Sequence, residues 1–162
     1  MNQIAILRRG FAGAAIAWAS VLPLASLAAS RSAVSSVTYL LTLAVYAIGS
    51  VICHQRPERS FYLWSHQMPV CARCTGIYIG AALAVLLSPA ARRLVDRRSL
   101  GGGGQPSVGR SPKGFMLIAA APTLATLVYE WSTSVTPSNW IRAASGLCLG
   151  AGVAVLIQRE VN

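Results

Sequence analysis

CHQRPERSFYLWSHQMPVCARCTG, residues 53–76, lies between two apolar segments and carries most of the reactive side chains of the chain. It contains three of the four cysteines, both histidines and three arginines. Pro57 and Pro69 lie inside it, and proline cannot continue a helix and disfavours helix in the residue before it. We therefore expect a loop at a membrane face, with one helix ending at Cys53 and another starting near Cys74.

The composition indicates an integral membrane protein. The chain has 162 residues, 54% hydrophobic and 11% charged, and its mean hydropathy is +0.55. Soluble domains carry about 25% charged residues. A helix of about 20 residues crosses a bilayer core of about 30 Å. We therefore predict an all-α membrane bundle of four or five transmembrane helices, from five apolar runs at residues 11–30, 32–53, 74–91, 114–131 and 141–157.

The first 31 residues allow two interpretations. Arg8 and Arg9 precede the first apolar run, and Ser26-Leu27-Ala28 resembles a small-x-small cleavage site of a signal peptide. The apolar region of a signal peptide usually has only about 7–15 residues, and this run is longer. We favour a retained transmembrane helix in residues 1–31, followed by a membrane domain in residues 32–162.

Residues 92–113 are basic and rich in glycine, which predicts a flexible linker. Short loops this basic stay in the cytoplasm. We therefore expect a bacterial inner (cytoplasmic) membrane protein, with the 53–76 loop on the outer face. Five spans would then place Arg8 and Arg9 outside, against the same rule. The net charge of +10 comes from residues that flank apolar runs, so the lipid bilayer, not nucleic acid, is the expected partner. The sequence does not indicate an oligomeric state.

The cysteines suggest a metal site first. Cys71 and Cys74 form a Cys-x-x-Cys pair, which brings two thiolates to one tetrahedral ion, and Zn²⁺ is the usual occupant. Cys53, at the end of the preceding helix, would supply a third ligand if the two helices pack as antiparallel neighbours. His54 or His66 would supply the fourth. A Cys₃His site would be closed and structural, whereas a Cys₃ site with water would be open.

Thiol redox chemistry is the main alternative. A Cys-x-x-Cys pair at a helix N-terminus has its thiolate stabilised by the helix dipole and by nearby cations such as Arg73. Cys71 and Cys74 would then be catalytic, with Cys53 as the resolving thiol and a quinone as electron acceptor. The sequence lacks a second cysteine pair to pass electrons onward. A third interpretation is a structural one, in which the cysteines only connect helices in an accessory protein, so enzymatic activity stays open.

The charged residues suggest a separate role. Arg56, Arg59 and Arg73 surround the start of a helix at the membrane surface, which suits an anion such as a lipid phosphate. Glu130, near the end of the fourth run, is either a catalytic candidate or an interfacial carboxylate. Arg142, at the start of the fifth run, is its expected partner.

These motifs resemble a known family. CHQRPERSF at residues 53–61 and PVCARCTGIYIG at residues 69–80 are similar to the signature of uncharacterised prokaryotic predicted membrane proteins, domain of unknown function 2085. The resemblance implies no established activity. Members of that family tend to carry an Asp-Gly pair in the fourth helix, where this chain has Thr126-Leu127. The resemblance therefore implies that the role of that Asp is lost here or passed to Glu130.

Overall fold

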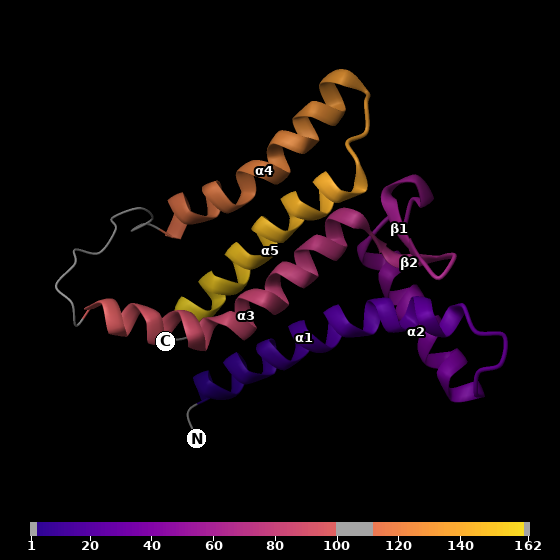
Figure 1. Ribbon diagram of the computed structural model, residues 1–162, viewed down its shortest axis with the longest axis horizontal. Coiled ribbons are helices and arrows are strands. Elements are labelled where there is room, and N and C mark those ends of the chain that lie inside the picture. Colours follow the sequence, from indigo (N-terminus) through magenta and orange to yellow (C-terminus); the bar gives the residue numbers. More distant parts are fainter. Residues whose placement is uncertain (1–2, 100–111, 161–162) are drawn as a thin grey trace.

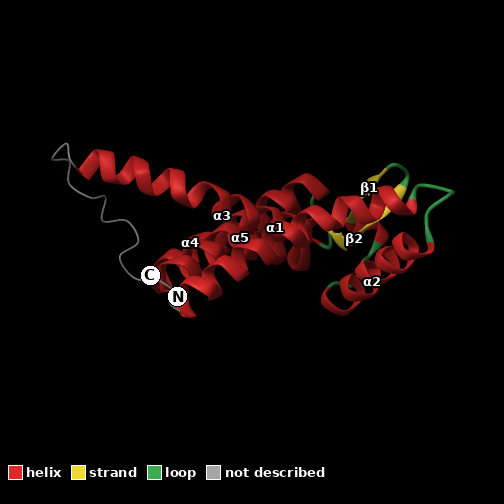
Figure 2. Ribbon diagram, turned by 90° about the horizontal axis from the view of Figure 1, so that it is seen from below, coloured by secondary structure: helices red, strands yellow, loops and turns green. Residues whose placement is uncertain are grey.

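The computed structural model describes residues 3–99 and 112–160 of the chain. This part contains five α-helices and one β-hairpin (Figure 1, Figure 2). The elements are α1 (Gln3–Ala29), α2 (Ser36–Ile52), the single-turn 3₁₀ helix η1 (Pro57–Arg59), β1 (Ser60–Leu63), β2 (His66–Cys71), α3 (Ala72–Ser99), α4 (Pro112–Thr133) and α5 (Asn139–Glu160). The predicted all-α membrane bundle is confirmed, with a small antiparallel sheet added to it.

Three helices in the described part are long and apolar enough to cross a membrane, judged by length and composition. Their apolar segments are Ile6–Ala29, Pro112–Thr133 and Asn139–Arg159. The apolar segments of α2 and α3, Ser36–Ile52 and Ala72–Leu87, are shorter. At about 1.5 Å per residue they reach about 25 Å, a little less than the hydrocarbon core. Many large apolar side chains on these helices are exposed in the protein, as contact with lipid requires.

Four helices lie side by side in one row, in the order α4, α5, α3 and α1 (Figure 1). The α3–α5 contact is the most extensive, and α4 packs on the other side of α5. Thr123 on α4 helps to hold that second contact, since its buried hydroxyl donates to the Ser145 carbonyl oxygen at 2.9 Å. The row places the N-terminal turns of α3 and α5 next to the end of α4, where the candidate site lies.

Glycines let α3 and α5 approach to backbone contact. A Cβ atom on Gly76 or Gly80 would collide with the α5 backbone, at Ala143 and Leu147 respectively. A Cβ atom on Gly146 or Gly150 would collide with the α3 backbone in the same way. Small residues four positions apart are a common means of close helix packing in membranes. The two glycine pairs visible in the sequence therefore face each other across one interface.

The placement of α2 differs from the prediction. We expected α2 and α3 to pack as antiparallel neighbours, but α2 packs on α1 and β2 and has hardly any contact with α3. Figure 2 shows α2 beside the hairpin, at one end of the row. The reason is that the 53–76 segment is not a simple loop: its two strands form a layer between α2 and the start of α3.

The hairpin carries no strong sequence signal. Leu63 pairs with His66, so Trp64 and Ser65 form a two-residue turn. Both have positive φ angles, 50° and 63°. Turns of this kind favour Asn-Gly or Asp-Gly, because a side chain is disfavoured there. Because Trp64 is bulky and unlike the residues preferred in such turns, the sequence did not predict this turn.

Both ends of the segment predicted as a linker, residues 92–99 and 112–113, lie in helices. Helix α3 continues to Ser99 and α4 begins at Pro112. Leucine, arginine and alanine are good helix formers, which favours the helical conformation of α3 as far as Ser99. Residues 100–111, which hold the glycine run, lie outside the described residues.

Candidate functional site

The end of α2 is connected to β2 by Gln55. Its backbone has a positive φ of 44°, and its side-chain Nε2 donates to the carbonyl oxygens of Tyr46, at 2.9 Å, and Pro69, at 2.6 Å. Gly49 faces the same carbonyl of Pro69, which a Cβ atom there would strike. The missing side chain at Gly49 and the amide of Gln55 together hold β2 against the end of α2.

A second glutamine strengthens the same connection from the hairpin. Gln67 Nε2 donates to the Gln55 carbonyl oxygen at 2.6 Å, and the Tyr46 hydroxyl donates to the Gln67 carbonyl oxygen at 2.6 Å. Neither glutamine was singled out from the sequence. Their signal is weak, because exposed and half-buried glutamines look the same in a single sequence. Their effect is to place Cys53, two residues before Gln55, beside the end of β2.

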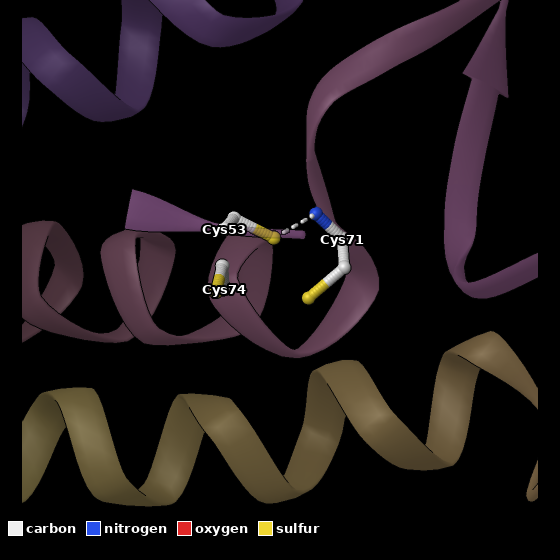
Figure 3. Close-up of side chains that lie close together, drawn as sticks. All are labelled: Cys53, Cys71 and Cys74. Carbon is white, nitrogen blue, oxygen red and sulfur yellow. Dashed lines mark hydrogen bonds between the residues drawn. The ribbon is translucent and has the colours of Figure 1, made fainter. Parts of the chain in front are cut away.

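The three predicted cysteines come together. The sulfur atoms of Cys53, Cys71 and Cys74 all lie within 4.8 Å of one another. Figure 3 shows them gathered at the start of α3, with the backbone N–H of Cys71 donating to Cys53 Sγ at 3.2 Å. Cys53 is buried in an apolar cluster with Leu22 of α1, and all four cysteines of the chain are unbridged thiols. The fourth, Cys148, is exposed on α5.

The thiol of Cys71 is the acidic member of this group. The side chain of Cys74 hydrogen-bonds it and lowers its pKa from 9.0 to about 5, although burial opposes the change. The Cys53 side chain and the backbone at Arg73 lower its pKa further. A hydrogen bond to the charged form favours that form. Cys71 is therefore a thiolate at neutral pH.

The two histidines lie apart from the sulfur atoms. Neither belongs to the cluster of possible metal ligands found among the described residues. His54 is exposed, but it lines the same cavity as the three cysteines. His66 is at the start of β2 and lines a different cavity, between α1 and α2. The fold therefore brings His54, and not His66, towards the thiols.

Beside the thiols lies a cluster of three arginines around one carboxylate. Arg73 Nη2 donates to Glu130 Oε1 at 2.9 Å, and Arg142 Nη2 forms an ion pair with the same oxygen at 3.0 Å. Arg59 Nη1 is 3.7 Å from the other carboxylate oxygen. Glu130 is only 8% exposed and Arg142 only 3%. The predicted Glu130–Arg142 pair is confirmed, and the two further arginines come from the hairpin segment and α3.

Thr126 lies one turn before Glu130 on α4 and also contacts Arg73. Arg73 Nη2 donates to its hydroxyl oxygen at 3.3 Å. A carboxylate at either position would therefore face the same guanidinium group. Asn139 connects the start of α5 to the hairpin, since its Nδ2 donates to the Ser60 carbonyl oxygen at 3.0 Å. The cluster thus joins the hairpin, α3, α4 and α5 at one end of the bundle.

Thiols and arginines border one shared cavity of about 400 Å³. Its size is within the range of small-molecule sites. The cavity is lined by side chains of three kinds: the thiols of Cys53, Cys71 and Cys74, the guanidinium-bearing chains of Arg56, Arg59, Arg73 and Arg142, and the neighbouring Ile52, His54 and Gln55. Such a cavity can offer soft sulfur ligands and positive charge to the same occupant.

A protein-family model matches the part of the chain that contains this site. Residues 53–156 match the model of a family described as a predicted membrane protein (DUF2085). An uncharacterized protein of Methanocaldococcus jannaschii is 45% identical over 56 residues, which are 35% of this chain and 36% of the relative. An uncharacterized protein of Methanothermobacter thermautotrophicus is 63% identical over 30 residues, which are 18% of this chain and 27% of the relative.

The chain therefore matches 36% and 27% of the length of these two curated relatives, both of which are archaeal. No solved structure matches it. The match of the family model begins at Cys53 and includes both the cysteine cluster and the Glu130–arginine cluster.

Proposed function

The chain belongs to the DUF2085 family of predicted membrane proteins, and from this premise we propose that it is a membrane metal-binding protein. Cys53, Cys71 and Cys74 are the ligands, and Zn²⁺ is the first ion to test. The observation that carries the proposal is the convergence, within 4.8 Å, of three sulfur atoms from the C-cap of α2, the end of β2 and the first turn of α3. Thiolates are the preferred ligands of soft and borderline ions, and Zn²⁺ is the usual occupant of such sites.

The geometry needs only a small adjustment to bind an ion. With Zn–S bonds of about 2.3 Å, sulfur atoms in a tetrahedral site lie about 3.8 Å apart. Sulfurs within 4.8 Å of one another can reach that spacing by side-chain rotation. The low pKa of the Cys71 thiol favours the deprotonated state that a metal ligand requires.

The fourth coordination position is open in this proposal. Three protein ligands and one exchangeable ligand are typical of zinc sites that react or exchange, whereas four protein ligands are typical of structural sites. His54 lines the cavity and is the protein side chain that would close the site. A site without it would present the ion to the cavity.

Metal analysis of the detergent-purified protein tests the proposal. We expect about one metal ion per chain, retained by the Cys148→Ser control and lost in the Cys71→Ser variant. Cys148 is exposed on α5 and outside the cluster, so the control has the same chemical change without the proposed ligand. Equal metal content in both variants would contradict the site. A His54→Ala variant that keeps the ion would support an open fourth position.

Thiol–disulfide exchange is a second candidate, favoured by the acidity of Cys71. Cys71 and Cys74 would be oxidised to a disulfide, and two electrons and two protons would reduce a quinone to a quinol. Cys53 would act as the thiol that opens a mixed disulfide with Cys71. Metal-free protein whose Cys71–Cys74 disulfide forms on addition of a quinone would support this candidate. Metal-free protein with an inert disulfide would instead support the third interpretation, in which the cysteines only connect helices in an accessory protein.

The orientation follows from the charge distribution and is part of the proposal. The basic residues at the end of α3, at Arg110 and at the start of α4 favour the cytoplasmic side. The cysteine cluster, at the start of α3, would then lie at the outer face of the membrane. A reporter fused within Gly101–Gly104 should read cytoplasmic. A periplasmic reading would instead put the thiols on the reducing side.

A further inference from the structure

We propose that the arginine side of the cavity binds a phosphate group, held by Arg142, Arg73 and Arg59. The site lies beside the thiols, but it does not require a metal ion, so it goes beyond the metal-binding proposal. The ligand chemistry is that of a tetrahedral oxyanion, either free phosphate or the headgroup of a phospholipid. Glu130 positions the guanidinium groups and leaves part of their charge uncompensated.

The balance of charges is the first argument. The cluster has three guanidinium cations and one carboxylate, so two positive charges have no protein counter-ion in the cluster. Water cannot stabilise the charge of Arg142, because this residue is only 3% exposed. Burying an uncompensated charge is costly, and buried charges are normally paired. Even three thiolates with a divalent ion would add only one negative charge, so the cavity stays cationic with the metal bound.

Unpaired donors are the second argument. The Nε atoms of Arg59, Arg73 and Arg142, and Nη2 of Arg142, are buried and make no hydrogen bond within the described residues. Arg142 Nη2 is close enough to Glu130 for an ion pair, but it lacks the alignment of a hydrogen bond. Two carboxylate oxygens do not satisfy three guanidinium groups. Buried donors without partners are rare in proteins, and a ligand is one ordinary reason for them.

The shape of the site is the third argument. Arg59, Arg73 and Arg142 come from η1, α3 and α5, yet all three line the same cavity of about 400 Å³. Arg56 lines it as well, from an exposed position. Guanidinium groups bind phosphate oxygens through paired N–H donors. Several such groups around one hollow favour an oxyanion over a neutral ligand.

Calorimetric titration of inorganic phosphate into metal-free protein in a maltoside detergent tests the proposal. We expect saturable binding at constant ionic strength, weakened about tenfold or more in Arg142→Gln. Arg31→Gln is the matched control, since it removes the same charge from an exposed position outside the cavity. Equal weakening of phosphate binding in both variants would overturn the proposal.

Arg142 is buried, so Arg142→Gln could also disturb folding. Arg56→Gln avoids this, because the Arg56 side chain is exposed, and severalfold weaker binding is expected there. Phosphate binding that is unchanged in Arg56→Gln and Arg142→Gln would refute the site. The Cys71→Ser variant separates this proposal from the metal site: it should lose zinc and keep phosphate binding.

A parallel titration with a short-chain phosphatidic acid identifies the source of the phosphate group. Tighter binding of the lipid than of inorganic phosphate, with the same loss in Arg142→Gln, assigns the site to a headgroup. Tighter binding of inorganic phosphate assigns it to a soluble anion. Lipid binding that is insensitive to Arg142→Gln, together with no binding of inorganic phosphate, would overturn the proposal.

Discussion

Replacing Glu130 by glutamine should strongly destabilise the bundle. The change keeps the size and shape of the side chain but removes its negative charge. The guanidinium groups of Arg59, Arg73 and Arg142 would then lie close together without a counter-ion at the end of α4. Because these groups connect three helices and the hairpin segment, we expect the loss to affect the whole fold and not only α4.

The expected magnitude follows from the burial of each pair. Removing one partner of a buried ion pair costs about 3–5 kcal/mol, because a charge is left buried and unpaired. The side chains of Glu130 and Arg142 are 6% and 3% exposed, so that pair belongs in this class. Arg59 is 33% exposed and 3.7 Å away, and water would screen most of its contribution. We therefore expect a loss of about 3 kcal/mol, or roughly a hundredfold in the unfolding equilibrium.

Reversible unfolding in mixed detergent micelles, followed by circular dichroism, would measure this loss. Glu58→Gln is the matched control, because Glu58 is exposed on η1 and should change stability by less than about 0.5 kcal/mol. Thr126→Asp should partly rescue Glu130→Gln, since Arg73 contacts both positions. A loss below about 1 kcal/mol in Glu130→Gln, or a double variant no more stable than the single one, would refute the reasoning.

Three further outcomes are expected. Gly150→Ala should destabilise the protein by about 1–3 kcal/mol in the same unfolding assay, because the added Cβ atom would collide with the α3 backbone. Gly13→Ala is the control: its added Cβ atom contacts nothing, so this change should be neutral or stabilising. In Gln55→Asn, the new asparagine tolerates the positive φ but its side chain is too short to reach β2. Metal affinity, measured by chelator competition, should therefore fall about tenfold. Unchanged affinity would show that Gln55 does not position Cys53. Alkylation of Cys71 in metal-free Cys148→Ser protein should be half-maximal at about pH 5 and fall further at lower pH, since protonation removes the thiolate; a midpoint near 8.5, as for an ordinary thiol, would contradict the hydrogen bonding described.

The sequence by itself determined the class of fold and predicted the pairing of Glu130 with Arg142. Uncharged runs of about 20 residues predict membrane helices, because the bilayer core requires that length and excludes unpaired charge. The pairing of Glu130 with Arg142 was expected, because each charge lies at the end of an apolar run where the other is the nearby opposite charge. These features depend on local periodicity or on the cost of charge in an apolar setting, both of which a sequence displays directly.

Only the tertiary structure decided how the site is assembled. The hairpin turn at Trp64–Ser65 lacks turn residues, so the layer between α2 and α3 could not be read from the sequence. That layer, held by Gln55 and Gln67, brings Cys53 to the other two thiols without α2 packing on α3.

The gathering of three arginines on Glu130 was equally hidden. Arg59 and Arg73 come from the hairpin segment and α3, and Glu130 comes from α4, more than 50 residues later in the chain. Charge pairing between such distant segments depends on which helices become neighbours. The close α3–α5 contact and the packing of α4 on α5 make these helices neighbours. This arrangement brings the three arginines to one buried carboxylate.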